Sequence, residues 1–196
     1  METQSMRTLL VFLLTVLFSV PLAAQKPTIL IVYHSETGHT FQMAEAVAAG
    51  AALSGEAEVL LRTTETVTEE ELRAATAIIV GSPVYNANVS PEVSRFIASW
   101  PFEGEPLKDK IGAAFVTGGG ISAGEELVQI AILQSMLVFG MIVAGGPDWT
   151  QPFGASAVTG EPPFRALEEG VDELFLKKGE SLGTRISRIA VRMASE

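Results

Sequence analysis

Short apolar runs alternate with helical patterns along the chain from Thr28 onward. The first run, TILIVY over Thr28–Tyr33, is unbroken and rich in β-branched residues, which is typical of a parallel strand buried on both faces. The same reasoning predicts four more strands, at Glu58–Arg62, Ala77–Gly81, Ile111–Thr117 and Met141–Gly145. Strands and helices in alternation predict an α/β fold built on a parallel sheet.

The first helical pattern covers Thr40–Leu53. Its apolar positions have the spacing of a helix that is buried along one side, and this stripe consists of Phe41, Ala44, Val47, Ala48 and Ala51. Thr68 and Glu71 have the spacing of a capping box, so a short helix is predicted to begin there. Ser90 followed by Pro91 predicts the start of the next helix, which should end near Trp100.

The helix predicted after the fourth strand ends at Gly140 and leaves little polar surface. Its apolar residues lie on all sides: Leu127, Ile130, Ala131, Leu133, Leu137 and Val138. This pattern favours a helix in the core or at an interface. Asp148–Gly160 is predicted as a long loop and Glu168–Phe175 as a short helix. The last helix is predicted over Ser181–Ala194, with Leu182, Ile186, Ile189, Ala190 and Met193 on one face.

The N-terminus has the three parts of a secretory signal. Arg7 precedes the apolar stretch Leu9–Val20, and the small-residue exit PLAAQ follows. The apolar stretch is shorter than the ~20 residues that a membrane span needs. Residues 1–24 are therefore predicted to be a signal peptide cleaved after Ala24, and residues 25–196 to be one exported domain, periplasmic or secreted. The alternative is an uncleaved signal that anchors the protein to a membrane.

The composition excludes some classes of function. The 196 residues are enough for one domain with a sizeable core. The net charge of −10 argues against a nucleic acid partner, because phosphate backbones select basic surfaces. An acidic surface of this kind favours docking to a basic partner. The chain has no cysteine, which fits an oxidising compartment.

The segment HSETGHT joins the first strand to the first helix. Ser35, Thr37 and Thr40 offer hydroxyl groups, and Gly38 lets the backbone turn close to a ligand. A helix start attracts anions through its free N–H groups and its dipole. The segment has no Lys or Arg, so GxxxxGK[ST] is absent, and its single glycine rules out GxGxxG. This chemistry favours a phosphate that is bound and kept rather than cleaved; the alternative is a polar turn that binds nothing.

Two more loops with small and polar residues follow strands. Gly81–Asn88, GSPVYNAN, follows the third strand, and Gly118–Gly120 with ISAGEE follows the fourth. In an open α/β sheet, ligands bind beyond the carboxyl ends of the strands, where the strand order reverses. The only histidines, His34 and His39, flank the first loop and are too few for a metal site, so no metal ligand is predicted.

These segments resemble the flavodoxin-like family. HSETGHT is similar to its phosphate loop, while GSPVYNANVSPEVSRFI, FVTGGGISAGEE and PFGASAVTG resemble one branch, the NAD(P)H:quinone oxidoreductases related to tryptophan-repressor-binding protein. The similarity covers nearly all of the chain after Lys26. It implies a three-layer sandwich, with a five-stranded parallel sheet of order 2-1-3-4-5 and helices on both faces.

The resemblance also implies FMN as the cofactor and assigns residues to it. The phosphate would be held by Ser35, Glu36, Thr37, Gly38, His39 and Thr40. One side of the flavin ring would be lined by Pro83, Val84, Tyr85 and Asn86, with Tyr85 as its main contact. The polar edge of the ring would accept backbone N–H donors from Val116, Thr117, Gly118, Gly119, Gly120 and Ile121. No acid or base residue is required, so none is predicted to be catalytic.

Three functions follow as hypotheses. The first is an FMN enzyme that takes a hydride from NADH or NADPH and reduces a small quinone-like acceptor. The second is an exported electron carrier that serves redox protein partners. Export and the absence of His from QSMLVFG, where the quinone-reducing branch usually has one, favour this second hypothesis. The third is an interaction module that has lost FMN. The branch forms tetramers, so the resemblance also suggests a homo-oligomer.

Overall fold

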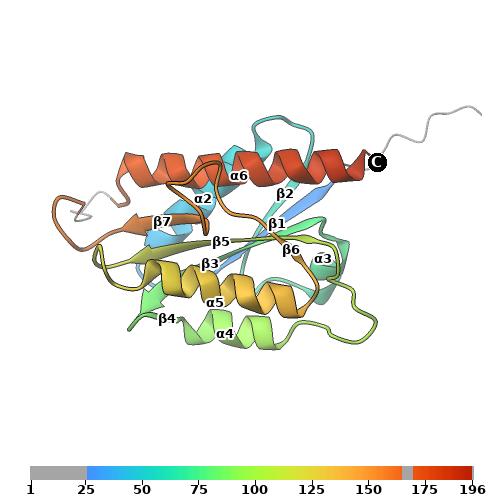
Figure 1. Ribbon diagram of the computed structural model, residues 1–196, viewed down its shortest axis with the longest axis horizontal. Helices are drawn as coiled ribbons and strands as arrows, with labels where there is room; N and C mark the ends of the chain where they lie inside the picture. Colours follow the sequence, from blue (N-terminus) through green and yellow to red (C-terminus); the bar gives the residue numbers. More distant parts are fainter. Residues whose placement is uncertain (1–25, 165–169, 196) are drawn as a thin grey trace, which may run out of the picture.

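The computed structural model describes residues 26–164 and 170–195. The predicted signal peptide, residues 1–24, lies outside the described residues. No helix in the described part of the chain combines the length and apolarity of a bilayer span. The central sheet has the order β2-β1-β3-β5-β6, and these strands pair in parallel (Figure 1). They are β1 (Thr28–Tyr33), β2 (Glu58–Thr63), β3 (Ala77–Tyr85), β5 (Ile111–Gly118) and β6 (Ile142–Val143).

Helices cover both faces of this sheet, so the predicted three-layer fold and strand order are confirmed (Figure 1). One face packs against α2 (His39–Ala52) and α6 (Glu173–Ala194). The other packs against α3 (Glu69–Ala74), α4 (Pro91–Ala98) and α5 (Glu125–Val138). The alternation of a strand explains the two cores, because Ile29 and Ile31 of β1 join the first while Leu30 and Val32 join the second.

The third strand is longer than predicted. It continues past Gly81 to Tyr85 and turns into β4 (Asn88–Val89), which pairs antiparallel with its end. β1 ends beside Gly81, so Ser82 and Pro83 of β3 pair with β5 alone, and Val84 and Tyr85 pair with β4. Pro83 therefore lies where its missing N–H is not needed by a neighbouring strand. The prediction that residues 81–88 form a loop is wrong for the first five of them.

The fifth strand position is divided between two short strands. β6 pairs with the start of β5, whereas β7 (Ala155–Val158) pairs with its end. The predicted strand Met141–Gly145 is thus shortened, and the predicted loop Asp148–Gly160 contains a strand. The residues of β7, ASAV, are small and carry little apolar signal, but Ala155 and Ala157 are fully buried against β5.

Three glycines bring α2 and α6 into close contact. A methyl group at Gly50 would lie 1.9 Å from the carbonyl oxygen of Glu180, and one at Gly183 would lie 2.0 Å from that of Val47. Gly179 faces Ala46 in the same way. Because of this contact, Met43 and Ala46 of α2 are buried, whereas Phe41 is 38% exposed. The core stripe predicted for this helix was therefore partly wrong.

The last helix is a single element from Glu173, not a short helix followed by a second one. Residues 168–169 of the predicted short helix lie outside the described residues. Gly179 and Gly183 interrupt the apolar pattern of the sequence, but here they are the contact points with α2. Leu182, Ile186 and Ala190 are buried as predicted, while Met193 is exposed.

The fourth predicted helix, α5, has a core face and an exposed face. Val128, Ile132 and Met136 are fully buried, which confirms its place in the core. Leu127 and Val138 are 62% and 71% exposed. A contact between subunits through this exposed face stays a prediction.

Candidate functional site

Three loops meet at the carboxyl edge of the sheet, at the left of Figure 1. They are the turn from β1 to α2, the β3–β4 hairpin and the turn from β5 to α5. The first contacts the second through Tyr85, whose hydroxyl donates to Oε2 of Glu36 at 2.8 Å. The hairpin contacts the third loop closely, since a methyl group at Gly124 would lie 2.6 Å from Cβ of Ala87. The structure therefore brings together the three segments that carry the sixteen predicted site residues.

The start of α2 has the geometry of an anion site. Gly38 is the N-cap of the helix with φ +91° and has no side chain to cap it. The first N–H groups of any helix lack partners within it. Ser35 Oγ accepts the N–H of Phe41 at 3.2 Å, which shapes the loop around this start. The N–H groups of His39 and Thr40 are thus left for a ligand.

The hydroxyl of Thr40 has a structural partner. It forms a 2.8 Å hydrogen bond with the hydroxyl of Thr117, and the two residues are 2% and 5% exposed. This bond fastens the head of α2 to the end of β5, beneath the site. A direct hydrogen bond from Thr40 Oγ1 to a phosphate stays a prediction. The backbone N–H of Thr40 lies at the helix start whether or not that bond forms. Thr37 is exposed and lies 3.1 Å from Nδ1 of His39.

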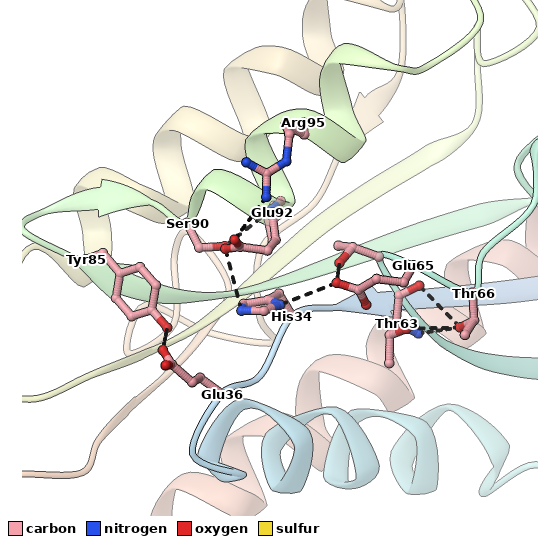
Figure 2. Close-up of polar contacts among 11 residues, drawn as sticks. His34, Glu36, Thr63, Glu65, Thr66, Tyr85, Ser90, Glu92 and Arg95 are labelled. Atoms are coloured by element: carbon pink, nitrogen blue, oxygen red, sulfur yellow. Dashed lines mark hydrogen bonds and ion pairs between the residues drawn. The ribbon is translucent and has the colours of Figure 1, made fainter.

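Tyr85 and Glu36 link two loops across the site (Figure 2). Burial, the hydrogen bond to Glu36 and the charges of Glu36 and Glu92 together raise the pKa of Tyr85 to about 12, with burial as the largest single cause. The phenol therefore remains a neutral donor. The carboxylate of Glu36 is held by this donor beside the loop that is predicted to bind phosphate.

His34 occupies a position between two carboxylates (Figure 2). Its Nδ1 lies 3.8 Å from Glu65, its Nε2 lies 3.5 Å from Glu92, and its side chain is 19% exposed. The pKa of Glu92 is lowered by its own backbone N–H, with smaller contributions from His34 and Arg95. His34 is therefore a packed residue that connects the end of β1 to α4.

The β3–β4 hairpin presents the predicted ring-side residues. Pro83, Val84 and Tyr85 are half-buried, and Asn86 is exposed at the turn. Asn86 and Ala87 have φ of 51° and 59°, as in the tight turns that match the twist of a hairpin. Sequence reasoning missed the role of Ser82, whose buried hydroxyl accepts the N–H of Ser90 at 3.1 Å and so joins the base of the hairpin to α4.

The third loop is held by a segment that follows β7. Gly118 O accepts the N–H of Thr159 at 2.9 Å, and the N–H of Ile121 donates to Oε2 of Glu161 at 2.7 Å. Sequence reasoning missed Thr159 and Glu161, because nothing local connects them with residues 40 positions earlier. Val116, Thr117 and Gly118 are buried, whereas Gly119 and Ile121 are exposed.

The donor set fits a phosphate and a planar ring. The phosphate would meet neutral hydroxyl and N–H donors, and space is open at Gly38 and Gly119, where a methyl group would have no other atom within 4 Å. The ring would meet a glycine-rich backbone on one side and the hairpin on the other. In flavodoxin-like sheets of this strand order, FMN binds at the switch point between β1 and β3, and these groups lie beside that point.

Comparisons with known proteins agree with this geometry. Residues 63–155 match the NADPH-dependent FMN reductase family. The chain is 32% identical over 161 residues to a flavodoxin of Clostridium saccharobutylicum, covering 81% of this chain and 97% of that protein. It is 30% identical over 162 residues to an NAD(P)H dehydrogenase (quinone) of Azorhizobium caulinodans, covering 70% and 80%. The crystal structure of a flavodoxin, WrbA-like protein from Agrobacterium tumefaciens has the same fold, with a TM-score of 0.69, 23% identity, and coverage of 85% and 98%.

Proposed function

We propose, from the premise that this chain belongs to the flavodoxin-like family and to its NAD(P)H:quinone oxidoreductase branch, that it is an FMN-dependent oxidoreductase. The observation that carries the proposal is the start of α2, which has a left-handed glycine as its N-cap and no acidic residue in its first turn. Such a start binds an anion through backbone N–H groups. The two other loops that flank it supply the space for a ring.

The residues of the chain would divide the work of binding. The α2 start, with the hydroxyls of Ser35 and Thr37, would hold the phosphate. Tyr85 and the residues before it would line one side of the ring, while the backbone from Val116 to Ile121 would border its polar edge. When bound, FMN would take reducing equivalents from NADH or NADPH and pass them to a quinone-like acceptor. The protein positions the cofactor and sets its potential.

A second candidate function is electron transfer between proteins. Two relatives named flavodoxin, from Clostridium saccharobutylicum and Aquifex aeolicus, are 32% and 36% identical to this chain. The net charge of −10 would also steer the protein toward a basic redox partner. An exported protein would be separated from cytoplasmic NAD(P)H, which favours this candidate if export is correct.

The decisive experiment is an absorption spectrum of the purified protein with FMN, before and after addition of NADH or NADPH, followed by turnover with benzoquinone. Bleaching of the bound flavin and sustained turnover would support the reductase. Bound FMN that NADH and NADPH reduce only at trace rates would favour the electron carrier. A colourless protein that does not bind added FMN would contradict both and leave the interaction module.

We also propose that the protein is exported and that its signal peptide ends at Ala24. The support is the charged start, the short apolar stretch and the small-residue exit of the sequence. Mass spectrometry of the protein recovered from the cell exterior would give a chain beginning at Gln25. An intact N-terminus in the membrane fraction would instead support the anchored alternative.

A further inference from the structure

Glu125 is an unusual residue for its position. Among residues 26–164 and 170–195 it is the only buried carboxylate, with 7% of its surface exposed. Its Oε1 has no hydrogen-bond partner among these residues. Leaving a buried polar atom without a partner costs free energy, and such groups occur mainly where a function requires them.

The carboxylate lies directly behind the third loop. A methyl group at Gly118 would be 2.6 Å from Oε1 of Glu125, so a larger residue there would have to displace the carboxylate. Thr117 points toward α2, where it bonds Thr40, and the next residue along a strand faces the opposite side. Gly118 therefore borders the candidate site, and it contacts Glu125 on the face of the sheet that α5 covers.

The helix itself offers one favourable interaction. Glu125 is the first residue of α5, after Gly124 with φ +102°, and no described side chain caps this start. The dipole of the helix favours a negative charge at that end. This interaction permits the charge at the head of α5, but it does not explain why the side chain is turned inward under the loop, since the neighbouring Glu126 has the same dipole and is exposed.

We propose that Glu125 sets the reduction potential of the flavin, a role that rests on the proposed binding of FMN. A fixed negative charge behind Gly118 raises the energy of added electron density on a ring bordered by that residue. The carboxylate therefore lowers the potential and makes the reduced flavin a stronger reductant. It acts through space, without contact with the acceptor, and burial strengthens its effect because little water screens it.

The test is a redox titration of bound FMN in the whole purified protein and in three variants. Glu125→Gln keeps the shape and removes the charge, so the ratio of reduced to oxidised flavin at a given potential should rise by about tenfold, which is about 30 mV for a two-electron couple. Glu125→Asp keeps the charge and should stay close to the wild type. Glu126→Gln removes the same charge from the exposed neighbour, and screening should limit its effect to about twofold or less.

Each other outcome of the titration bears directly on the proposal. An unchanged potential in Glu125→Gln, in a protein that still binds FMN, would overturn the proposal and leave the proposed function intact. Loss of FMN by Glu125→Gln with an unchanged circular dichroism spectrum would also overturn it, because the carboxyl would then be a structural support of the loop. Equal shifts of the reduction potential in Glu125→Gln and Glu126→Gln would overturn the proposal, because the effect would then come from general surface charge. A wild-type protein without FMN affinity would refute the proposed function itself.

Discussion

The starts of α2 and α5 have a similar backbone, but only the start of α5 carries negative charge. Gly38 and Gly124 are their N-caps, with φ of +91° and +102°, and neither glycine has a side chain that could cap its helix. The first turn of α2 contains no acidic residue, whereas that of α5 contains Glu125 and Glu126. The start of α2 is therefore open to an anionic ligand, whereas the start of α5 already carries carboxylates of the chain itself.

The other helices show what these two starts lack. Thr68, Ser90 and Asp172 cap α3, α4 and α6 with their side chains. Those caps satisfy backbone N–H groups within the chain. The two helix starts without them both follow strands at the edge where the three loops meet. In the proposed site, this difference assigns the phosphate of FMN to the α2 start and its ring to the side of α5.

The largest effect is expected when the start of α2 is given the negative charge that the start of α5 has. His39→Glu places a carboxylate at the first position of α2, where it would repel a phosphate and occupy the N–H groups. FMN affinity should fall by about 30-fold, since a charge at a partly buried helix start is worth up to ~2 kcal/mol. Fluorescence titration with FMN measures it.

Ala49→Glu is the matched control for this change. Ala49 is exposed and lies in the later part of the same helix, so the variant adds the same charge away from the loop. It should leave FMN affinity nearly unchanged. Equal losses in the two variants would show that overall charge, not the α2 start, governs binding.

The hydrogen bond between Thr40 and Thr117 connects the two ends of the site, and removing one partner should cost more than removing both. Thr40→Val leaves the buried hydroxyl of Thr117 unpaired, which should lower the free energy of unfolding by about 1 to 2 kcal/mol. In the double variant with Thr117→Val, no buried hydroxyl is left unpaired, so the loss should be smaller than that of either single variant. Urea denaturation of the four proteins measures this coupling, and strict additivity would contradict it.

The shared glycine conformation can be tested at Gly38. Gly38→Ala meets no other atom within 4 Å, but its φ of +91° is strained for alanine, at a cost of about 1 kcal/mol. We expect a loss of that size in stability together with weaker FMN binding. Gly55→Ala is the matched control, since Gly55 has φ +69°, equal space and a place outside the three loops. It should lose stability alone; weaker FMN binding in both variants would contradict a local role for Gly38.

Much of this architecture follows from local patterns in the sequence. The buried strand Thr28–Tyr33 and the capping box at Thr68 were predicted correctly, because an apolar run and a cap are each set by a few neighbouring residues. The length of β3 was missed, since it depends on where β1 ends beside it. The strand Ala155–Val158 was missed because its residues are small and only β5 makes them a strand.

The candidate site was predictable as three loops but not as a set of contacts. The glycine, serine and threonine residues of each loop mark it in the sequence. The partners of those loops come from distant segments: Glu161 reaches Ile121, and Thr117 takes the hydroxyl of Thr40. Glu125 had no sequence signal either, because an acidic residue at a helix start is usually exposed.

The smallest expected effect concerns Glu36, the carboxylate that Tyr85 holds beside the α2 start. The folded-state pKa of Tyr85 is raised from 10.0 to about 12, so the stability that its neutral phenol contributes is complete below pH 10 and is lost as the pH rises through about 12. The phenolate absorbance, as the difference between wild type and Tyr85→Phe, should report this titration. Glu36→Gln should lower the pKa but leave it above 10.0, because burial is the larger cause. A return to 10.0 would instead make Glu36 the main cause.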